Sequence, residues 1–145
     1  MITRSHGGLL AGLDRRMVQT MLGVALPPSA ADVNYIRWQP SGELAYFEAL
    51  VRFDASPDDY QLFVSQRGLT LFANSGPNVH LPIDWRAPAA IETPSWWTPS
   101  TLTPADAASG KVGLHGSLAV KWQEGHVYAV IVDTGERPSP DGARR

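Results

Sequence analysis

The chain has 145 residues, of which 43% are hydrophobic and 18% charged, so it is long enough for one domain with a single core and too apolar for a disordered segment. Twelve basic against fourteen acidic residues give a net charge of −2, which argues against the basic surface that nucleic-acid binding needs. The lack of cysteine excludes disulfides, iron–sulfur clusters and cysteine nucleophiles.

The N-terminal segment indicates the cellular location that the sequence predicts. Its weakly apolar run is interrupted by Asp14, Arg15 and Arg16. A secretory signal needs an unbroken apolar stretch, and a membrane-spanning helix needs about twenty apolar residues. The sequence as written therefore predicts a soluble, cytoplasmic protein with no membrane span, and a cell-envelope location is expected only if the N-terminus is incomplete.

An apolar stripe at spacings of three and four predicts an amphipathic helix over 9–22, with Asp14 on another side. The stripe consists of Leu10, Leu13, Met17 and Met21. Gly23 is placed to end this helix, and the following Pro27 and Pro28 cannot continue it. We expect the chain to turn back there through an extended proline corner.

The next two segments alternate between apolar and polar residues, over 32–39 and 44–53, and the letters PSGE lie between them. Alternation over ten residues is typical of a strand with one face in the core. The inward side of the second strand is expected to hold Phe47, Ala49, Val51 and Phe53. The two segments predict a hairpin with a loop of three to four residues.

A second helix is predicted between Ser56 and Gly68. Ser56 is a good N-cap, Pro57 a favoured first residue, and two aspartates follow where negative charge suits a helix start. The expected buried stripe is Tyr60, Phe63 and Val64, with Gly68 as the stop and a short strand over 69–73 after it. Asp58 and Asp59 have the chemistry of acid–base or metal-binding carboxylates, but at a helix start we interpret them as capping residues.

Residues 74–110 are rich in proline and hold three of the five tryptophans. A connection of this length is functional, disordered, or packed down by its own apolar groups. Large aromatic side chains are scarce in disordered linkers, so we expect an ordered loop that lies over the sheet.

A second hairpin is predicted over 116–133, with the letters QEG as its turn. Its second strand is apolar on both sides, which indicates a central strand covered on both faces. A three-residue loop would place His115 opposite Asp133 and His126 opposite Trp122. The whole pattern predicts one α+β domain over 1–134, with a mostly antiparallel sheet of four to five strands, two helices on one face, the long loop and a polar tail over 135–145.

Few residues suggest chemistry. A His115–Asp133 pair would orient an imidazole as a general base, but no nucleophile accompanies it, and a cross-strand pair is the simpler interpretation. A shift of one residue would place Thr134 opposite His115 instead. His80 and Asp84 have a metal-like spacing of four, but Pro82 between them disfavours a helix.

The letters SGKVGLHGS resemble a phosphate-binding loop but lack its first glycine and the hydroxyl residue after the lysine. No G-x-S-x-G, H-E-x-x-H or G-x-G-x-x-G pattern is present either. We therefore predict no catalytic residue, no metal site and no cofactor.

The loop tryptophans are the best candidates for binding, together with His80. Trp85, Trp96 and Trp97 either form a stacking surface for a ligand or plug the sheet with their large apolar area, and the plug is the favoured interpretation. Because neighbouring residues of an extended segment face opposite ways, at most one of Trp96 and Trp97 is expected to act as a plug, which leaves the other exposed.

Several segments resemble a small uncharacterised bacterial α+β domain found in lipoproteins. They are LGVALPPSAADV, VRFDASPDDYQLFV, the WW pair and VIVDT, and they span residues 18–134. The chain lacks the export signal and the lipidated cysteine of those proteins. The resemblance implies the α+β fold and brings no catalytic residue with it.

The leading functional expectation is a non-catalytic binding or accessory module that contacts a protein or a small ligand through the tryptophan-bearing loop, within a cell-envelope or defence-related assembly. One alternative is a small hydrolase-like enzyme that uses His115 with Asp133, or His80. The other is an inhibitor or immunity-like protein.

Overall fold

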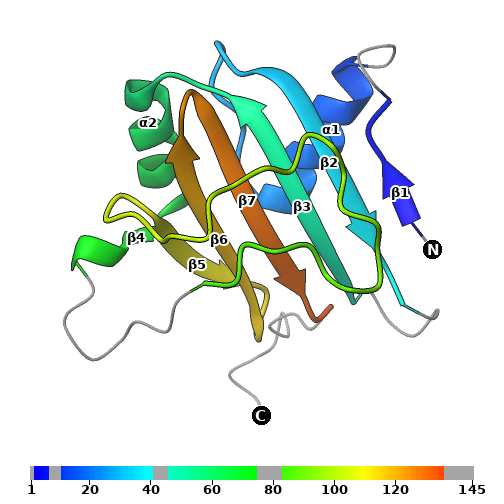
Figure 1. The fold of residues 1–145 in the computed structure, drawn as a ribbon. Coiled ribbons are helices and arrows are strands. Elements are labelled where there is room, and N and C mark those ends of the chain that lie inside the picture. The colour runs from blue at the N-terminus through cyan, green and yellow to red at the C-terminus, as the bar shows by residue number, and fades with distance from the viewer. Residues whose placement is uncertain (1, 7–10, 41–45, 75–82, 136–145) are drawn as a thin grey trace, which may run out of the picture.

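A computed structural model of the chain describes residues 2–6, 11–40, 46–74 and 83–135 (Figure 1). Within these residues, seven strands form one antiparallel sheet in the order β1-β2-β3-β7-β6-β5-β4. The elements are β1 (Ile2–Arg4), α1 (Ala11–Leu22), β2 (Ala31–Trp38), β3 (Phe47–Asp54), α2 (Pro57–Arg67), β4 (Thr70–Leu71), the 3-10 helix η1 (Phe72–Asn74), β5 (Ala108–Val112), β6 (Gly116–Gln123) and β7 (His126–Asp133). The predicted α+β class with an antiparallel sheet is confirmed.

The predicted number of four to five strands was too low. The strands that the pattern missed are β1, with three residues at one edge, and β5, which lies at the end of the expected loop. The strand expected over 69–73 has only two residues, β4, before the chain enters η1. Two or three residues are too few to show a period of two, so the pattern could not identify β1 or the bounds of β4. The five residues of β5, ASGKV, hold only two apolar side chains and do not alternate.

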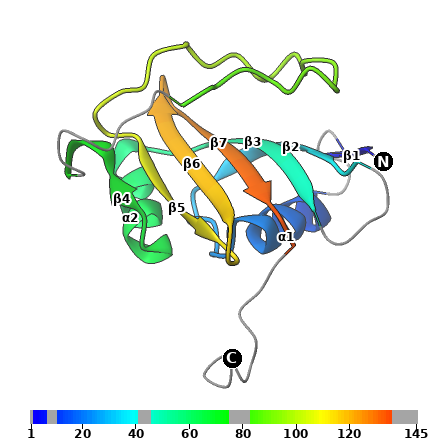
Figure 2. The same cartoon turned by 90° about the horizontal axis from the view of Figure 1, so that it is seen from below.

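The molecule has three layers. Figure 2 shows α1 and α2 on one face of the sheet and the segment 83–107 across the other. We call the helix-covered side the inner face and the loop-covered side the outer face. Two helices on one face and an ordered loop over the sheet were both predicted, and both are found in the described residues.

The middle strand of the sheet is β7, between β3 and β6. Its central position and its apolar character on both faces were predicted from the sequence. On the neighbouring strand, Phe47, Ala49, Val51 and Phe53 point into the inner core, also as predicted. Leu50, between them, points outward into a second apolar cluster beneath the loop.

The buried side of α1 differs from the expected stripe. Asp14 is 1% exposed and Val18 is fully buried, whereas Leu13 is 46% exposed. Asp14 tolerates burial because its Oδ2 accepts a hydrogen bond from the His6 amide at 2.8 Å, while its Oδ1 lies 2.6 Å from His6 Nδ1. The partner comes from the segment after β1, so the helix pattern could not reveal it. The helix ends at Leu22, followed by Gly23 at φ +75°, as predicted.

The segment around α2 is held by capping contacts. The Ser56 hydroxyl accepts a hydrogen bond from the Asp59 amide at 3.2 Å, and Gly68 takes a left-handed conformation with φ 73°. The Leu69 amide then bonds to the Val64 carbonyl at 3.0 Å, which closes the helix end. Tyr60, Phe63 and Val64 are buried. The predicted caps of this helix are confirmed at both ends.

We expect Ser56→Ala to lower the free energy of unfolding by about 1 kcal/mol, because the alanine leaves an amide of the first turn without its acceptor. Urea denaturation measures the loss. Ser65→Ala, at an exposed position of the same helix, is the matched control and should cost nothing. Equal effects of the two substitutions would contradict the capping role.

The first hairpin has a longer connection than predicted. β2 ends at Trp38 and β3 begins at Phe47, so the expected loop of three to four residues was too short. Residues 41–45 of this connection, like most of the predicted tail 135–145, lie outside the described residues. None of the described helices is both long and apolar enough to cross a membrane.

Candidate functional site

The outer face of the sheet has a polar half and an apolar half. Cross-strand pairing places Arg52 beside Tyr128, and Tyr128 beside Lys121. The same register places Leu50 beside Val130, two residues further along. Because paired residues share a face, the polar and the apolar side chains form separate rows beneath the loop.

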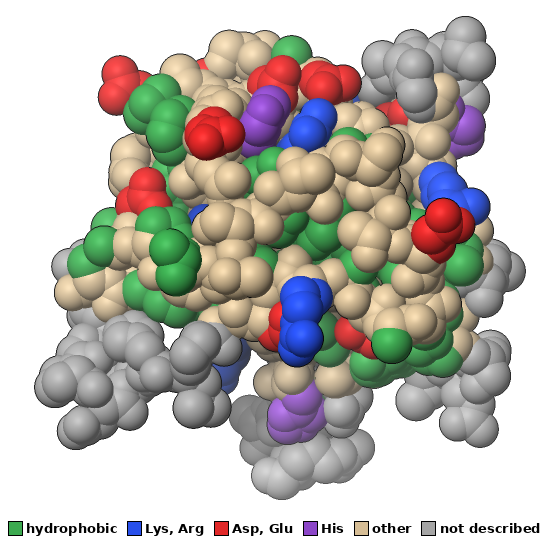
Figure 3. Space-filling model, in the orientation of Figure 1, with side chains coloured by type: hydrophobic (Ala, Val, Ile, Leu, Met, Phe, Trp, Pro, Cys, Tyr) green, Lys and Arg blue, Asp and Glu red, His purple; other side chains and the backbone are tan. Residues whose placement is uncertain are grey.

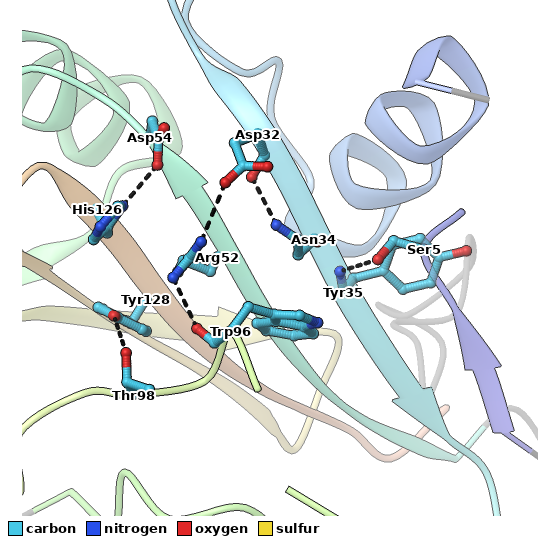
Figure 4. Close-up of polar contacts among 10 residues, drawn as sticks. All are labelled: Ser5, Asp32, Asn34, Tyr35, Arg52, Asp54, Trp96, Thr98, His126 and Tyr128. Atoms are coloured by element: carbon cyan, nitrogen blue, oxygen red, sulfur yellow. Dashed lines mark hydrogen bonds and ion pairs between the residues drawn. The ribbon is translucent and has the colours of Figure 1, made fainter. Parts of the chain in front are cut away.

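The polar row, Arg52, Tyr128 and Lys121, anchors the loop to the sheet. Arg52 donates to a loop carbonyl and Tyr128 shares a hydrogen bond with a loop hydroxyl, as Figure 4 shows. The contacts are Arg52 Nη1 to Trp96 O at 3.0 Å, Tyr128 Oη with Thr98 Oγ1 at 3.1 Å, Ser100 N to Gln123 Oε1 at 2.9 Å, and Lys121 Nζ to Ser100 O at 2.6 Å and to Leu102 O at 3.0 Å. Every second loop residue from 96 to 102 is therefore anchored to the sheet.

Trp85 and Trp97 act as plugs. They are 3% and 4% exposed, and the Trp97 indole meets Tyr128 edge to face with ring centroids 5.3 Å apart. Trp97 Nε1 donates to the Trp85 carbonyl at 2.8 Å, and Trp85 Nε1 donates to Thr103 Oγ1 at 3.0 Å. Each indole therefore buries its ring and satisfies its polar atom inside the loop.

Of the paired tryptophans, one was expected to be a plug and the other exposed, and only the first expectation is met, because Trp96 packs against the outer cluster. Trp97 is buried and Trp96 is half-buried. The segment is a turn rather than an extended strand, because the Trp97 amide donates to the Pro94 carbonyl at 3.0 Å. The two rings stand at 88° to each other. His80, the remaining predicted binding residue, lies outside the described residues.

A cleft of about 520 Å³ opens between loop residues 84–89 and the apolar half of the outer face. Its floor includes Leu50 and Val130, and Ala87 lies on its loop side. Figure 3 views this face and shows hydrophobic side chains between segments of the loop. A smaller hollow of about 190 Å³ shares Ala87 and is lined by Trp85 and Trp97.

Three charged residues line the same cleft: Glu48, Asp84 and Arg86. Arg86 Nε and Nη2 lie 3.0 and 3.2 Å from the two oxygens of Asp84, so these two side chains neutralise each other. The hydrogen bonds from Arg86 lower the pKa of the Asp84 carboxyl. Glu48 accepts a hydrogen bond from the Tyr46 hydroxyl at 3.2 Å. The remaining net charge of the cleft is therefore the carboxylate of Glu48.

The predicted register of the second hairpin was wrong by one residue. Gln123 pairs with His126 and Trp122 with Val127, because the turn has two residues, Glu124 and Gly125, both with positive φ. Asp133 pairs with Phe47 of β3, and His115 lies in the turn before β6. The strand register therefore gives no support to a His115–Asp133 pair.

Two other histidine–aspartate pairs are found among the described residues. His126 Nδ1 lies 2.6 Å from Asp54 Oδ1 at the paired ends of β7 and β3, and both side chains are partly exposed (Figure 4). The second pair joins His6 to the buried Asp14. Sequence reasoning missed both pairs, since each depends on contacts between distant segments. Among the described residues, no three His, Asp or Glu side chains gather in a way that could hold a metal ion.

Comparison of the chain with protein-family models, with curated proteins and with solved structures gives no match. A functional assignment therefore depends on the geometry of the described residues. The outer face offers two features for it: the cleft, and the Asp54–His126 pair at the opposite end of the same face.

Proposed function

We propose that this protein is a non-catalytic binding module whose outer-face cleft holds a small apolar ligand beneath the tryptophan-bearing loop. The observation that carries the proposal is a cleft of about 520 Å³ with an apolar floor, between loop residues 84–89 and strands β3 and β7. Small-molecule sites commonly have volumes of about 300–1,000 Å³ and mostly apolar linings.

The rigidity of the cleft supports this proposal. One wall is the central sheet, and the other is loop residues 84–89. The polar row anchors the returning leg of the same loop from Trp96 to Leu102. The buried indoles of Trp85 and Trp97 join the two legs of that loop. A preformed site binds more tightly than a flexible one, because less conformational entropy is lost on binding.

The distribution of exposed apolar residues favours a small ligand over a docked protein. Among the described residues, the large exposed ones lie on separate elements. They are Ile2, Leu13, Leu62, Leu102 and Leu114. A protein-binding surface would instead gather such residues in one patch, so an inhibitor or immunity-like role has weaker support.

The enzyme alternative also has weaker support. The Asp54–His126 pair is built like the orienting half of a general base. This pair does not line the cleft. Among the described residues, no hydroxyl or amine nucleophile bonds to the imidazole of His126 or to that of His6. A general base acts on a substrate or water held beside it, and the Asp54–His126 pair lines neither of the two hollows at the outer face.

We expect Ala87→Trp to fill the cleft and to weaken binding of 1-hexanol at least about tenfold, because the indole takes the volume that the probe occupies. Titration followed by amide NMR shifts of Leu50 and Val130 measures the affinity. Ala105→Trp, at an exposed position of the same loop, should leave it unchanged. Absence of shifts at the cleft in the wild-type protein would overturn the proposal.

A further inference from the structure

The charged residues at the outer-face cleft indicate which ligands it prefers, an inference that rests on the proposed function. Two carboxylates and one guanidinium line the cleft, and Asp84 with Arg86 forms a closed pair. Glu48 then supplies an unbalanced negative charge beside an apolar floor. A ligand with a positive charge at one end would complement it.

Glu48 stands between two aromatic side chains. Tyr46 Oη donates to Glu48 Oε2 at 3.2 Å. Trp38 lies directly opposite Glu48 in the pairing of β2 with β3, on the same face of the sheet. Directly paired residues have Cβ atoms about 4.5–5.5 Å apart, so the two side chains leave the sheet side by side. Both aromatic side chains are half-exposed and remain accessible.

The tyrosine hydroxyl occupies one oxygen of the carboxylate as a hydrogen-bond donor. Burial and the negative charge of Glu48 both raise the pKa of Tyr46. The hydroxyl of Tyr46 therefore stays neutral and donates a hydrogen bond to the carboxylate. Among the described residues, this hydroxyl is the hydrogen-bond donor found at Glu48. The second carboxylate oxygen is available to a ligand.

We propose that the cleft binds an organic cation, an alkylammonium whose charged head lies at Glu48 and whose apolar chain extends over Leu50 and Val130 toward Ala87. A carboxylate supplies the opposite charge, and the faces of Trp38 and Tyr46 attract the cation through their ring quadrupoles. The floor and the loop wall exclude water from the chain.

The test compares four probes that share one chain length: hexylamine, hexyltrimethylammonium, 1-hexanol and hexanoate. We expect the two cations to bind at least about tenfold more tightly than 1-hexanol, and hexanoate more weakly than 1-hexanol. Glu48→Gln should reduce cation binding to the level of the alcohol and leave 1-hexanol unaffected. Glu92→Gln, which removes an exposed carboxylate elsewhere on the loop, is the matched control and should keep the preference.

A second variant separates the aromatic contribution from the charge. Trp38→Leu should weaken the binding of hexyltrimethylammonium severalfold, while 1-hexanol still binds. If 1-hexanol binds at the cleft but neither cation binds more tightly, the ligand preference is wrong and the proposed function stands. If no probe shifts the cleft signals, both are wrong.

Discussion

Replacing Trp97 by alanine should lower the free energy of unfolding by about 3–5 kcal/mol. The indole is 4% exposed, and it meets Tyr128 at 5.3 Å between ring centroids. Its removal leaves a cavity in the outer cluster and deprives the Trp85 carbonyl of its donor. Small domains are stable by only about 5–15 kcal/mol, so this variant should be close to unfolding under mild conditions.

Trp96→Ala is the matched control, because it removes the same side chain from the neighbouring position. Trp96 is half-buried, and its carbonyl, which accepts the bond from Arg52, survives the substitution. We expect Trp96→Ala to lower the free energy of unfolding by about 1 kcal/mol. Urea denaturation at neutral pH compares the two variants. A small loss for both would show that the loop contributes little to stability.

The stability of the wild-type protein should rise with pH between about 8 and 10, because Lys121 is buried without a carboxylate partner among the described residues. Its side chain is fully buried, and its ammonium lies 4.6 Å from the centre of the Trp85 ring. Bonds to the carbonyls of Ser100 and Leu102 compensate only part of the lost hydration. Burial therefore lowers the pKa of Lys121 from 10.5 to about 8.

The direction of the effect follows from proton binding. Between about pH 8 and pH 10.5 the folded protein has released the Lys121 proton while the unfolded chain still holds it. Stability rises with pH wherever the unfolded state binds more protons. Over the whole interval the gain is about 3 kcal/mol, at about 1.4 kcal/mol per pH unit. Below about pH 8 both states are protonated, and the cost of the buried charge is constant.

Lys121→Met should remove this rise, whereas Lys111→Met, at an exposed position of β5, should keep it. Urea denaturation from pH 7 to pH 10 measures the slope. The raised pKa of Tyr60 acts in the opposite direction at higher pH, because the folded state then holds the extra proton. A wild-type stability that stays flat or falls from pH 8 to pH 10 would show that Lys121 is hydrated.

The features that could be predicted from the sequence are those with local causes. The caps of α2 depend on Ser56, Pro57 and Gly68, which act on residues within one or two turns. The alternation in β3 and the doubly apolar β7 reflect burial of each strand on its own faces. Such patterns can be recognised in the sequence without knowledge of the segments that pack against them.

Two kinds of feature could not be predicted: a turn that lacks its usual sequence signal, and a contact between distant segments. The turn at Glu124 and Gly125 lacks the Asn-Gly or Asp-Gly signal of a two-residue hairpin, and an error of one residue there moved the expected partner of His115. The Asp54–His126 pair joins residues 72 positions apart. The sequence offers no local signal for such a pairing.

The candidate site was only partly visible in the sequence. The sequence directs attention to the tryptophan-bearing loop, and the structure shows that Trp85 and Trp97 are buried rather than presented on a surface. The sequence pattern does not single out Glu48. Its place at the cleft depends on the loop that covers β3, which is a tertiary feature.

Hydrogen exchange of the indole N–H groups tests most directly whether residues 83–107 form an integral third layer. Both Trp85 Nε1 and Trp97 Nε1 are hydrogen-bonded within that layer. If the layer unfolds only together with the sheet, these protons exchange with the same free energy as the central amides of β7, such as that of Ala129. Exchange of both indoles at a free energy several kcal/mol lower, while β7 stays protected, would contradict it.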